Sequence, residues 1–108
     1  MTKNLALLAF VFFLLALTPA LSSAQDAAAT FKSKCAMCHG PDGSGKTAMG
    51  EKFKIRDIRS ADVQNQTDAE LVQIVTKGKN KMPPYEGKLT KEQIDQAVAY
   101  VRELAKKK

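Results

Sequence analysis

Hydrophobic residues in the first half of the chain follow helical spacing over one segment. Between Asp26 and about Cys38, three consecutive alanines have high helix propensity, and Phe31 and Cys35 lie four residues apart on one face. Asp26 is a suitable N-cap, and a Gly-Pro pair after residue 39 is a natural end. The pattern therefore predicts a first helix over about residues 26–38.

A second helix is indicated by a capping box. Thr67 is followed by Glu70 three residues later, and apolar residues then recur on one face until Gly78. Glycine is the common residue just after a helix. The pattern predicts a helix over residues 68–77.

The last helix begins with the same signal, since Thr90 is followed by Gln93. Apolar residues continue at helical spacing to about Ala105, and the final lysines suit the negative C-terminal end of a helix. No segment alternates apolar and polar residues as a strand does, so the domain is predicted to be all-α.

The segments between these helices lack a sustained apolar period. Residues 40–62 are rich in glycine and predict a long surface loop, with a short turn of helix around residues 49–53. Residues 79–89 contain two consecutive prolines directly after Met82, which exclude helix and stiffen an extended path. Met82 is therefore expected on a stiff connection between two helices.

The N-terminus has the three parts of a secretory signal. Lys3 precedes an unbroken apolar run over residues 5–17, and small residues follow up to Ala24. The run is shorter than the roughly 20 residues that a membrane-spanning helix needs. The prediction is a signal peptide over residues 1–24, a mature domain over residues 25–108, and a place of work outside the cytoplasm.

Length and composition exclude a multidomain enzyme. The chain has 108 residues, with 17 Lys and Arg against 11 Asp and Glu, two Cys and one His. A domain this small usually needs a disulfide, a metal or another covalent feature besides its core. The two cysteines are only three residues apart, and a disulfide closing so short a ring would constrain little of the unfolded chain.

The segment Cys35-Ala-Met-Cys38-His39 is the attachment pattern of c-type haem. Two cysteines one helical turn apart present both sulfurs on one side, where they can form thioethers with the two vinyl groups of the macrocycle. His39, the sole histidine, then lies under the iron, which neutral imidazole ligates well.

Other uses of a Cys-x-x-Cys pair fit less well. A thioredoxin-like dithiol needs a βαβ context that the sequence lacks, and zinc would need a fourth ligand from a carboxylate. Copper is the strongest alternative, since Met37, Met49 and Met82 offer soft sulfur ligands.

Met82 is the predicted second axial ligand of the iron. It follows His39 by a long interval on the proline-stiffened connection, which can hold a thioether over the opposite haem face. Met49 in the glycine-rich loop is the second candidate, and Met37 lies inside the attachment turn and cannot reach across. A His/Met iron has no open site and a raised potential, which suits one-electron transfer and disfavours oxygen activation or gas binding.

With these residues identified, the chain resembles the small soluble monohaem class I cytochromes c of bacterial periplasms and photosynthetic lumens. The resemblance covers the mature domain and rests on Phe31, the string Cys35-Ala-Met-Cys-His-Gly-Pro-Asp-Gly-Ser-Gly45, Lys81-Met82-Pro83, and Ala97-Val-Ala-Tyr-Val-Arg102. It implies the class I cytochrome c fold, three to four helices wrapped around one covalently bound haem c. The first and last helices would cross, with Phe31 against Tyr100 and Val101.

The resemblance also implies a function and a location. The chain would be a soluble one-electron carrier of the periplasm or thylakoid lumen, not an enzyme, with haem held by Cys35 and Cys38 and ligated by His39 and Met82. The alternatives are a copper-binding or copper-delivery protein, and a haem gas sensor or peroxidase with a labile methionine.

Its partners would be other redox proteins. A quinol:cytochrome c reductase would be a typical donor, and a terminal oxidase, a reductase or a photosynthetic reaction centre a typical acceptor. Lys77, Lys79, Lys81 and Lys88 flank the Met82 segment and are predicted to dock an acidic partner. Neither nucleic-acid binding nor stable membrane insertion after signal cleavage is expected.

One departure from the family pattern concerns His39. Family members commonly have a proline in the loop after the attachment motif, whose carbonyl accepts a hydrogen bond from the second ring nitrogen of the histidine. No proline lies between Gly43 and Asp62, so this acceptor is unassigned. Arg56 and Arg59 are candidates for neutralising the haem propionates.

Overall fold

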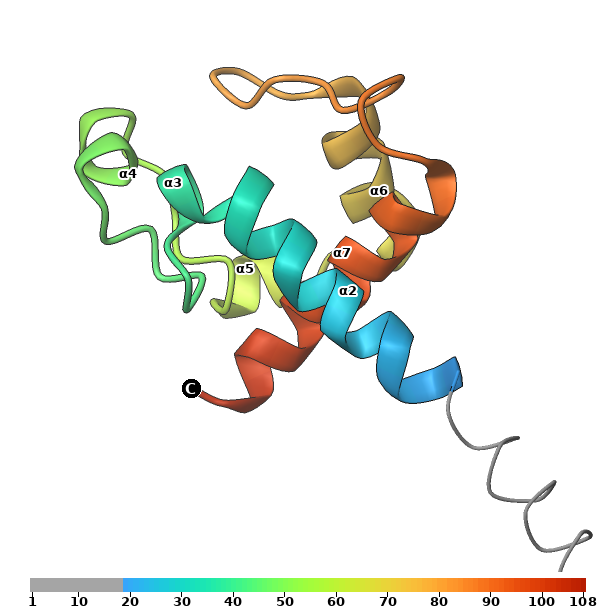
Figure 1. Cartoon of the computed structure of the whole chain (residues 1–108). Helices are drawn as coiled ribbons and strands as arrows, with labels where there is room; N and C mark the ends of the chain where they lie inside the picture. The colour runs from blue at the N-terminus through green and yellow to red at the C-terminus, as the bar shows by residue number, and fades with distance from the viewer. Residues whose placement is uncertain (1–18) are drawn as a thin grey trace, which may run out of the picture.

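The computed structural model describes residues 19–108, so the first part of the predicted leader lies outside the described residues. The described helices are α2 (Pro19–Lys34), α3 (Ala36–His39), α4 (Ala48–Lys52), α5 (Ala61–Gln64), α6 (Asp68–Lys77) and α7 (Lys91–Lys106). Over residues 19–108 only isolated β-bridges accompany them, which confirms the all-α prediction there (Figure 1). In the same range, no helix is both long and apolar enough for a membrane span.

Both predicted capping boxes are present. The Thr67 amide donates to the Glu70 carboxylate at 2.8 Å, and the Glu70 amide donates to the Thr67 hydroxyl at 3.1 Å. Thr90 and Gln93 make the equivalent pair of bonds at 2.9 and 3.1 Å. Each box satisfies two amides that have no partner inside the helix, which is why α6 and α7 begin where the sequence predicts.

The prediction for the first helix was wrong at both ends. The helix begins at Pro19 rather than at Asp26, because the uncleaved chain supplies further helix-compatible residues, and Asp26 is therefore not its N-cap. It ends at Lys34, since Cys35 leaves the helical region with φ −120° and ψ −34°, and α3 resumes at the next residue. The predicted cleavage site after Ala24 lies inside α2 and stays a prediction.

The long loop contains more helix than predicted. The turn expected around residues 49–53 is α4, which Thr47 caps by accepting a hydrogen bond from the Gly50 amide at 2.8 Å. The sequence pattern missed α5, a single turn that begins after Ser60. A helix of four residues is too short to show apolar periodicity, and so this pattern could not reveal it.

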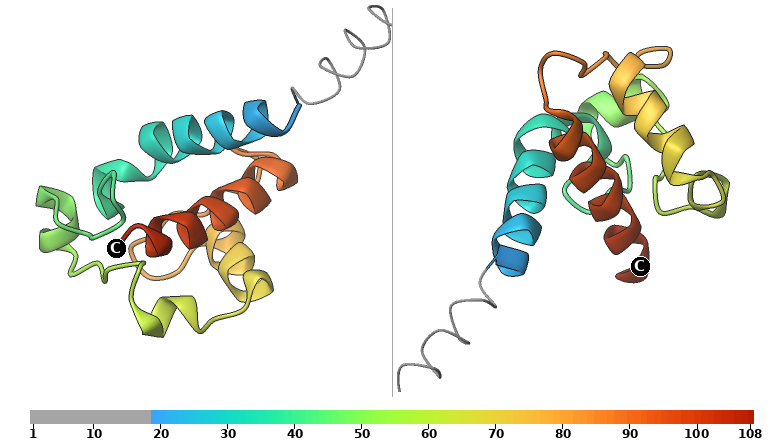
Figure 2. Two further views of the ribbon diagram at one scale, coloured as in Figure 1. Left: turned by 90° about the horizontal axis from the view of Figure 1, so that it is seen from below. Right: turned by 90° about the vertical axis from the view of Figure 1, so that its right-hand side faces the viewer.

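The crossing of α2 and α7 forms the centre of the core (Figures 1 and 2). The rings of Phe31 and Tyr100 lie 5.1 Å apart between centroids, tilted by 51°, which confirms the predicted contact. Phe31 is only 2 % exposed, and such burial is worth about 1.5–3 kcal/mol. The buried cluster consists of Phe31, Ile58, Val63, Leu71, Val98 and Leu104, with Val101 packed against it.

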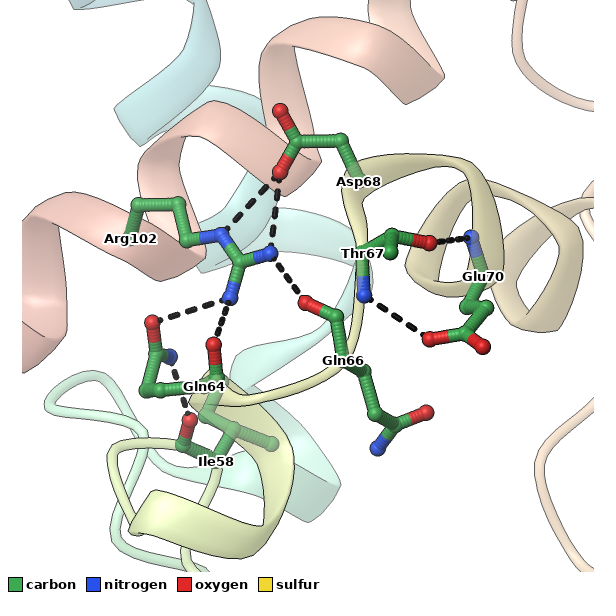
Figure 3. Close-up of polar contacts among 7 residues, drawn as sticks. All are labelled: Ile58, Gln64, Gln66, Thr67, Asp68, Glu70 and Arg102. Atoms are coloured by element: carbon green, nitrogen blue, oxygen red, sulfur yellow. Dashed lines mark hydrogen bonds and ion pairs between the residues drawn. The ribbon is translucent and has the colours of Figure 1, made fainter.

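Arg102 on α7 fastens the connection between α5 and α6 (Figure 3). Its guanidinium donates to the main-chain oxygens of Gln64 at 2.9 Å and Gln66 at 2.6 Å, and its Nε donates to Asp68 at 3.1 Å. The Gln64 side chain in turn donates to the Ile58 carbonyl at 2.8 Å. One side chain of the last helix thereby holds the loop that precedes α6.

Candidate functional site

The attachment turn places both cysteines and the histidine at the end of the first helical segment. The amides of Cys38 and His39 donate to the Cys35 carbonyl at 3.2 and 3.0 Å, which closes one short helical turn. Both thiols are free and half-buried. Since the spacing is one turn, Cys35, Cys38 and His39 all line one cavity, as the sequence predicts.

Hydrogen bonds from the glycine-rich loop hold this turn in place. The Gly45 amide donates to the His39 carbonyl at 2.7 Å, and the Thr47 hydroxyl donates to the Cys38 carbonyl at 2.9 Å. Gly50 lies so close that a Cβ there would collide with the carbonyl oxygens of Gly45 and Cys38. The loop therefore fixes the main chain of the residues that carry the chemistry.

The connection between α6 and α7, residues 78–90, is named here the Met82 strap. Lys79 and Met82 exchange two main-chain hydrogen bonds, of 3.1 and 2.9 Å, which form a tight turn. Gly78 has φ +76°, and a Cβ at this residue would lie 2.7 Å from the Met82 carbonyl oxygen. A larger residue at position 78 would therefore displace the main chain at Met82.

Two adjoining cavities lie between the attachment turn and the Met82 strap. Their volumes are about 260 and 220 Å³, and together they reach the size of natural ligand sites, roughly 300–1,000 Å³. Cys35, His39 and Met82 line both cavities, and Cys38 lines the first. The second cavity is mostly apolar, with Phe31, Ile58, Val63, Leu71, Ile74, Val75, Leu89, Ala97, Val98 and Val101 in its wall.

Met82 is distinguished from the other candidate methionines by this geometry. Met49 is half-buried on α4 and lines neither cavity. Met37 also lies outside both, and it is 76 % exposed on the attachment turn. The structure thus brings together all four predicted site residues and leaves both rival methionines outside.

Burial sets the protonation of the site. It lowers the pKa of His39, so the imidazole is neutral near pH 7, and its buried Nδ1 has no hydrogen-bond partner. Burial, with the nearby Cys38 as a second cause, raises the pKa of Cys35 to about 11. Burial also raises the pKa of Tyr85, with the two cysteines as further causes. The Cys35 thiol and the Tyr85 phenol therefore carry their protons at neutral pH.

The donor set fits a haem. Two free thiols, a neutral imidazole with an unpartnered ring nitrogen and a thioether meet at a cavity with a largely apolar wall. Iron in haem accepts imidazole and thioether ligands, and the apolar wall suits a macrocycle. Among the described residues there is no cluster of three or more His, Cys, Asp or Glu side chains suited to a metal ion.

Basic residues surround the mouth of the first cavity. Its lining includes Lys34, Lys54, Arg56, Lys79 and Lys81 and no carboxylate. Of the predicted docking lysines, Lys79 and Lys81 lie at this mouth, whereas Lys77 pairs with Glu86 at 2.6 Å and Lys88 lies 5.9 Å from the Tyr85 ring centroid. The basic residues at this mouth form a cationic rim, which shares only Lys79 and Lys81 with the predicted patch.

The two candidate arginines differ in their position relative to the cavities. Arg56 lines both cavities. Arg59 lines neither and is bound in a bidentate pair with Asp57, with two N–O distances of 2.9 Å. Only Arg56 is positioned to face an anionic group inside the site.

Lys34, Lys54 and Tyr85 are among the lining residues that the sequence did not predict. Lys34 and Lys54 flank the attachment turn and α4, and Tyr85 lies in the wall of both cavities. Tyr85 is an aromatic residue three positions after Met82, and this spacing was the available signal. Charged residues such as Lys34 and Lys54 gave none, because they are usually only solvated.

Several known proteins are similar to this chain along most of its length. The model of a family described as cytochrome c oxidase, cbb3-type, subunit III matches residues 22–101. Cytochrome c6 of Porphyra purpurea is 35% identical over 105 residues, covering 94% of this chain and 93% of the relative. Cytochrome c6 of Thermosynechococcus vestitus is 36% identical over 99 residues, covering 90% and 86%.

A solved structure agrees with these relatives. The KustC0563 c-type cytochrome superposes with a TM-score of 0.67 at 29% sequence identity. The match covers 72% of this chain and 95% of that one, so nearly the whole of the known domain has a counterpart here.

Proposed function

The chain belongs to the small monohaem class I cytochromes c, and on that premise we propose that Cys35, Cys38, His39 and Met82 hold its haem. Membership makes the chain an electron carrier with one covalently bound haem c rather than an enzyme. The observation that carries the residue assignment is the shared cavity, which has the two thiols and the imidazole on one wall and the Met82 thioether in the wall formed by the strap.

Cys35 and Cys38 supply the covalent attachment. Each thiol would add across one vinyl group: the sulfur would bond to one carbon, the thiol proton would go to the other, and no oxidant would be consumed. Burial raises the pKa of the Cys35 thiol to about 11, so this thiol brings the proton that the vinyl carbon would receive. The thioethers also supply the covalent staple that a domain of this size needs.

His39 and Met82 would ligate the haem iron. His39 is neutral and offers a ring nitrogen lone pair, and Met82 offers a soft sulfur that favours the reduced metal. When bound, the haem supplies a one-electron Fe(III)/Fe(II) couple. With both ligands bound, the iron would have no open site for oxygen, peroxide or a gas.

We assign a propionate-binding role to Arg56, because it is the arginine that faces the cavities. Its guanidinium can neutralise a carboxylate with two hydrogen bonds. Arg59 is already engaged by Asp57 and is not assigned this role.

The carrier exchanges electrons with other redox proteins, and we propose that they dock at the cationic rim. Lys34, Lys54, Lys79 and Lys81 are exposed around the cavity mouth, and this arrangement favours an acidic docking face on the partner. A quinol:cytochrome c reductase as donor and an oxidase, a reductase or a reaction centre as acceptor fit this role. Export to the periplasm or a lumen, directed by residues 1–24, is part of the same proposal.

Attachment is tested on protein matured in a cell that exports and assembles c-type cytochromes. Haem is expected to stay with the denatured chain during acidic solvent extraction, and neither cysteine should react with an alkylating reagent. Cys35→Ala/Cys38→Ala should lose all retained haem. A colourless product with both thiols free to alkylate would contradict the proposal.

A further inference from the structure

The Met82 strap is tied mainly to its own neighbour, α6. The Tyr85 amide donates to the Val75 carbonyl at 3.0 Å, and the Glu86 amide donates to the Thr76 carbonyl at 3.1 Å. The exposed ion pair between Lys77 and Glu86 joins the same two segments. These contacts hold the strap to α6 and do nothing to hold it against the wall that carries Cys35 and His39.

One hydrogen bond crosses from the strap to that wall. The Tyr85 hydroxyl donates to the Lys34 carbonyl at 2.9 Å, across 51 positions of sequence. Among the described residues, this is the only hydrogen bond recorded between the strap and residues 19–56. The two prolines after Met82 have no amide hydrogen and could not supply another.

The acceptor is a carbonyl that the helix leaves free. Lys34 is the last residue of α2, and the Cys38 amide bonds to the Cys35 carbonyl instead of continuing the helical pattern back to Lys34. Unpaired carbonyls at a helix end need an outside partner. Tyr85 satisfies this one at the residue directly before Cys35.

We propose that Tyr85 is a positioning residue whose hydroxyl latches the Met82 strap to the end of α2 and thereby keeps Met82 in its axial position. The inference rests on the proposed function, since it presupposes Met82 as a ligand. The Tyr85 ring is half-buried and lines both cavities. Removing the hydroxyl alone therefore removes the hydrogen bond and keeps the ring in the cavity wall. Without the latch, the strap stays attached to α6 but moves away from the attachment wall more often.

The test is the affinity of the oxidised holoprotein for imidazole, which can bind the iron only when Met82 leaves. Tyr85→Phe removes the hydroxyl and keeps the ring. We expect its imidazole association constant to rise about three- to tenfold, the effect of losing one hydrogen bond from the closed state. Tyr100→Phe is the matched control, because Tyr100 is also half-buried and no side-chain hydrogen bond is recorded for it among the described residues.

The readouts separate the latch from general destabilisation and from failure of the ligand assignment. If Tyr85→Phe and Tyr100→Phe both bind imidazole as the wild type does, the latch is refuted. The latch is also refuted if both variants gain imidazole affinity equally and lose the same free energy of unfolding. If the wild-type protein lacks the methionine-to-iron charge-transfer band, the proposed function fails instead.

A measurement on the wild-type protein covers the case in which Tyr85→Phe does not mature. In the reduced, diamagnetic holoprotein, the Tyr85 hydroxyl proton should exchange slowly with water and show an NMR cross-peak to the α-protons of Lys34 or Cys35. A hydroxyl proton in fast exchange, with no such cross-peak, would refute the latch.

Discussion

On the proposed ligand set, the Met82 side chain would decide between a closed electron carrier and an open haem. The sequence offered three internal methionines as soft ligands, and only Met82 lines the cavities that His39 also lines. Sequence spacing could exclude Met37 but could only rank Met49 below Met82. The distinction came from tertiary structure, because α4 carries Met49 away from the cavity wall.

Met82→Ala should open the sixth position of the iron. We expect the wild-type reduced protein not to bind carbon monoxide at neutral pH and the variant to bind it readily. The reduction potential should fall by on the order of 100 mV, a fraction of the roughly 0.8 V that axial ligands span. Met49→Ala is the control and should leave the charge-transfer band, the potential and the lack of carbon monoxide binding unchanged. If Met49→Ala binds carbon monoxide and Met82→Ala does not, Met49 is the ligand instead.

Asp57 gives a second prediction at the level of a single residue, a stability that depends on pH. Hydrogen bonds from Arg59 lower the pKa of Asp57 from 3.8 to about 2. Because the folded pKa lies below the unfolded one, this contribution is present above about pH 4 and is lost as the pH falls toward 2. Asp57→Asn should therefore cost about 1 kcal/mol at pH 7 after allowing for solvent screening, and much less near pH 2.

Urea denaturation of the holoproteins at pH 7, 4 and 2.5 checks this difference. Asp95→Asn is the control, since its ion pair with Lys91 is largely exposed and should be worth less than about 0.5 kcal/mol. An Asp57→Asn cost that does not shrink between pH 4 and pH 2.5 would rule out the Arg59 pair as its source.

At the scale of elements, the helices with strong local signals were predictable and their interruptions were not. Capping boxes placed the starts of α6 and α7, because these signals act within one turn of chain. The break at Cys35 and the single turn of α5 have no comparable local signature. The same holds for the site, where the attachment motif could be read directly but the Tyr85 contact joins residues 51 positions apart.

Arg102 makes the connection between α5 and α6 dependent on α7. Its side chain is 25% exposed and donates to two main-chain carbonyls, one carboxylate and the side-chain oxygen of Gln64. Hydrogen bonds to charged groups contribute about 1.5–3 kcal/mol, and unpaired carbonyls add a penalty. Arg102→Ala should therefore lower the unfolding free energy by about 2–4 kcal/mol.

Arg102→Lys tests whether the forked shape of the guanidinium matters. Lysine keeps the charge but cannot reach the same acceptors in one plane, so about half of the loss should remain. Lys106→Ala is the control on the same helix, because its pair with Glu103 is exposed and should contribute less than about 0.5 kcal/mol. Equal stabilities for Arg102→Ala and Lys106→Ala in urea denaturation would show that the network does not stabilise the fold.

At the scale of the whole molecule, basic residues line the cavity through which we propose that electrons enter and leave. The chain carries a formal net charge of +6, and the first cavity opens among five basic residues without a carboxylate. A cationic rim raises the local concentration of anionic reactants and speeds their encounter. The direction of this effect can be measured with small redox ions, which need no knowledge of the biological partner.

Lys79→Glu/Lys81→Glu should reverse the preference of the carrier for reactant charge. Oxidation of the reduced holoprotein by anionic ferricyanide should slow about three- to tenfold at low ionic strength, and reduction of the oxidised form by the hexaammineruthenium(II) cation should accelerate. Both differences should nearly vanish at about 0.5 M salt, where the screening length is only a few ångströms. Lys106→Glu/Lys107→Glu changes the net charge equally at the C-terminal end of α7, which lies across the molecule from the Met82 strap (Figures 1 and 2). Rate changes of equal size in the two double variants would mean that only net charge matters. A larger change in Lys79→Glu/Lys81→Glu would show that electrons pass through the rim at the cavity mouth.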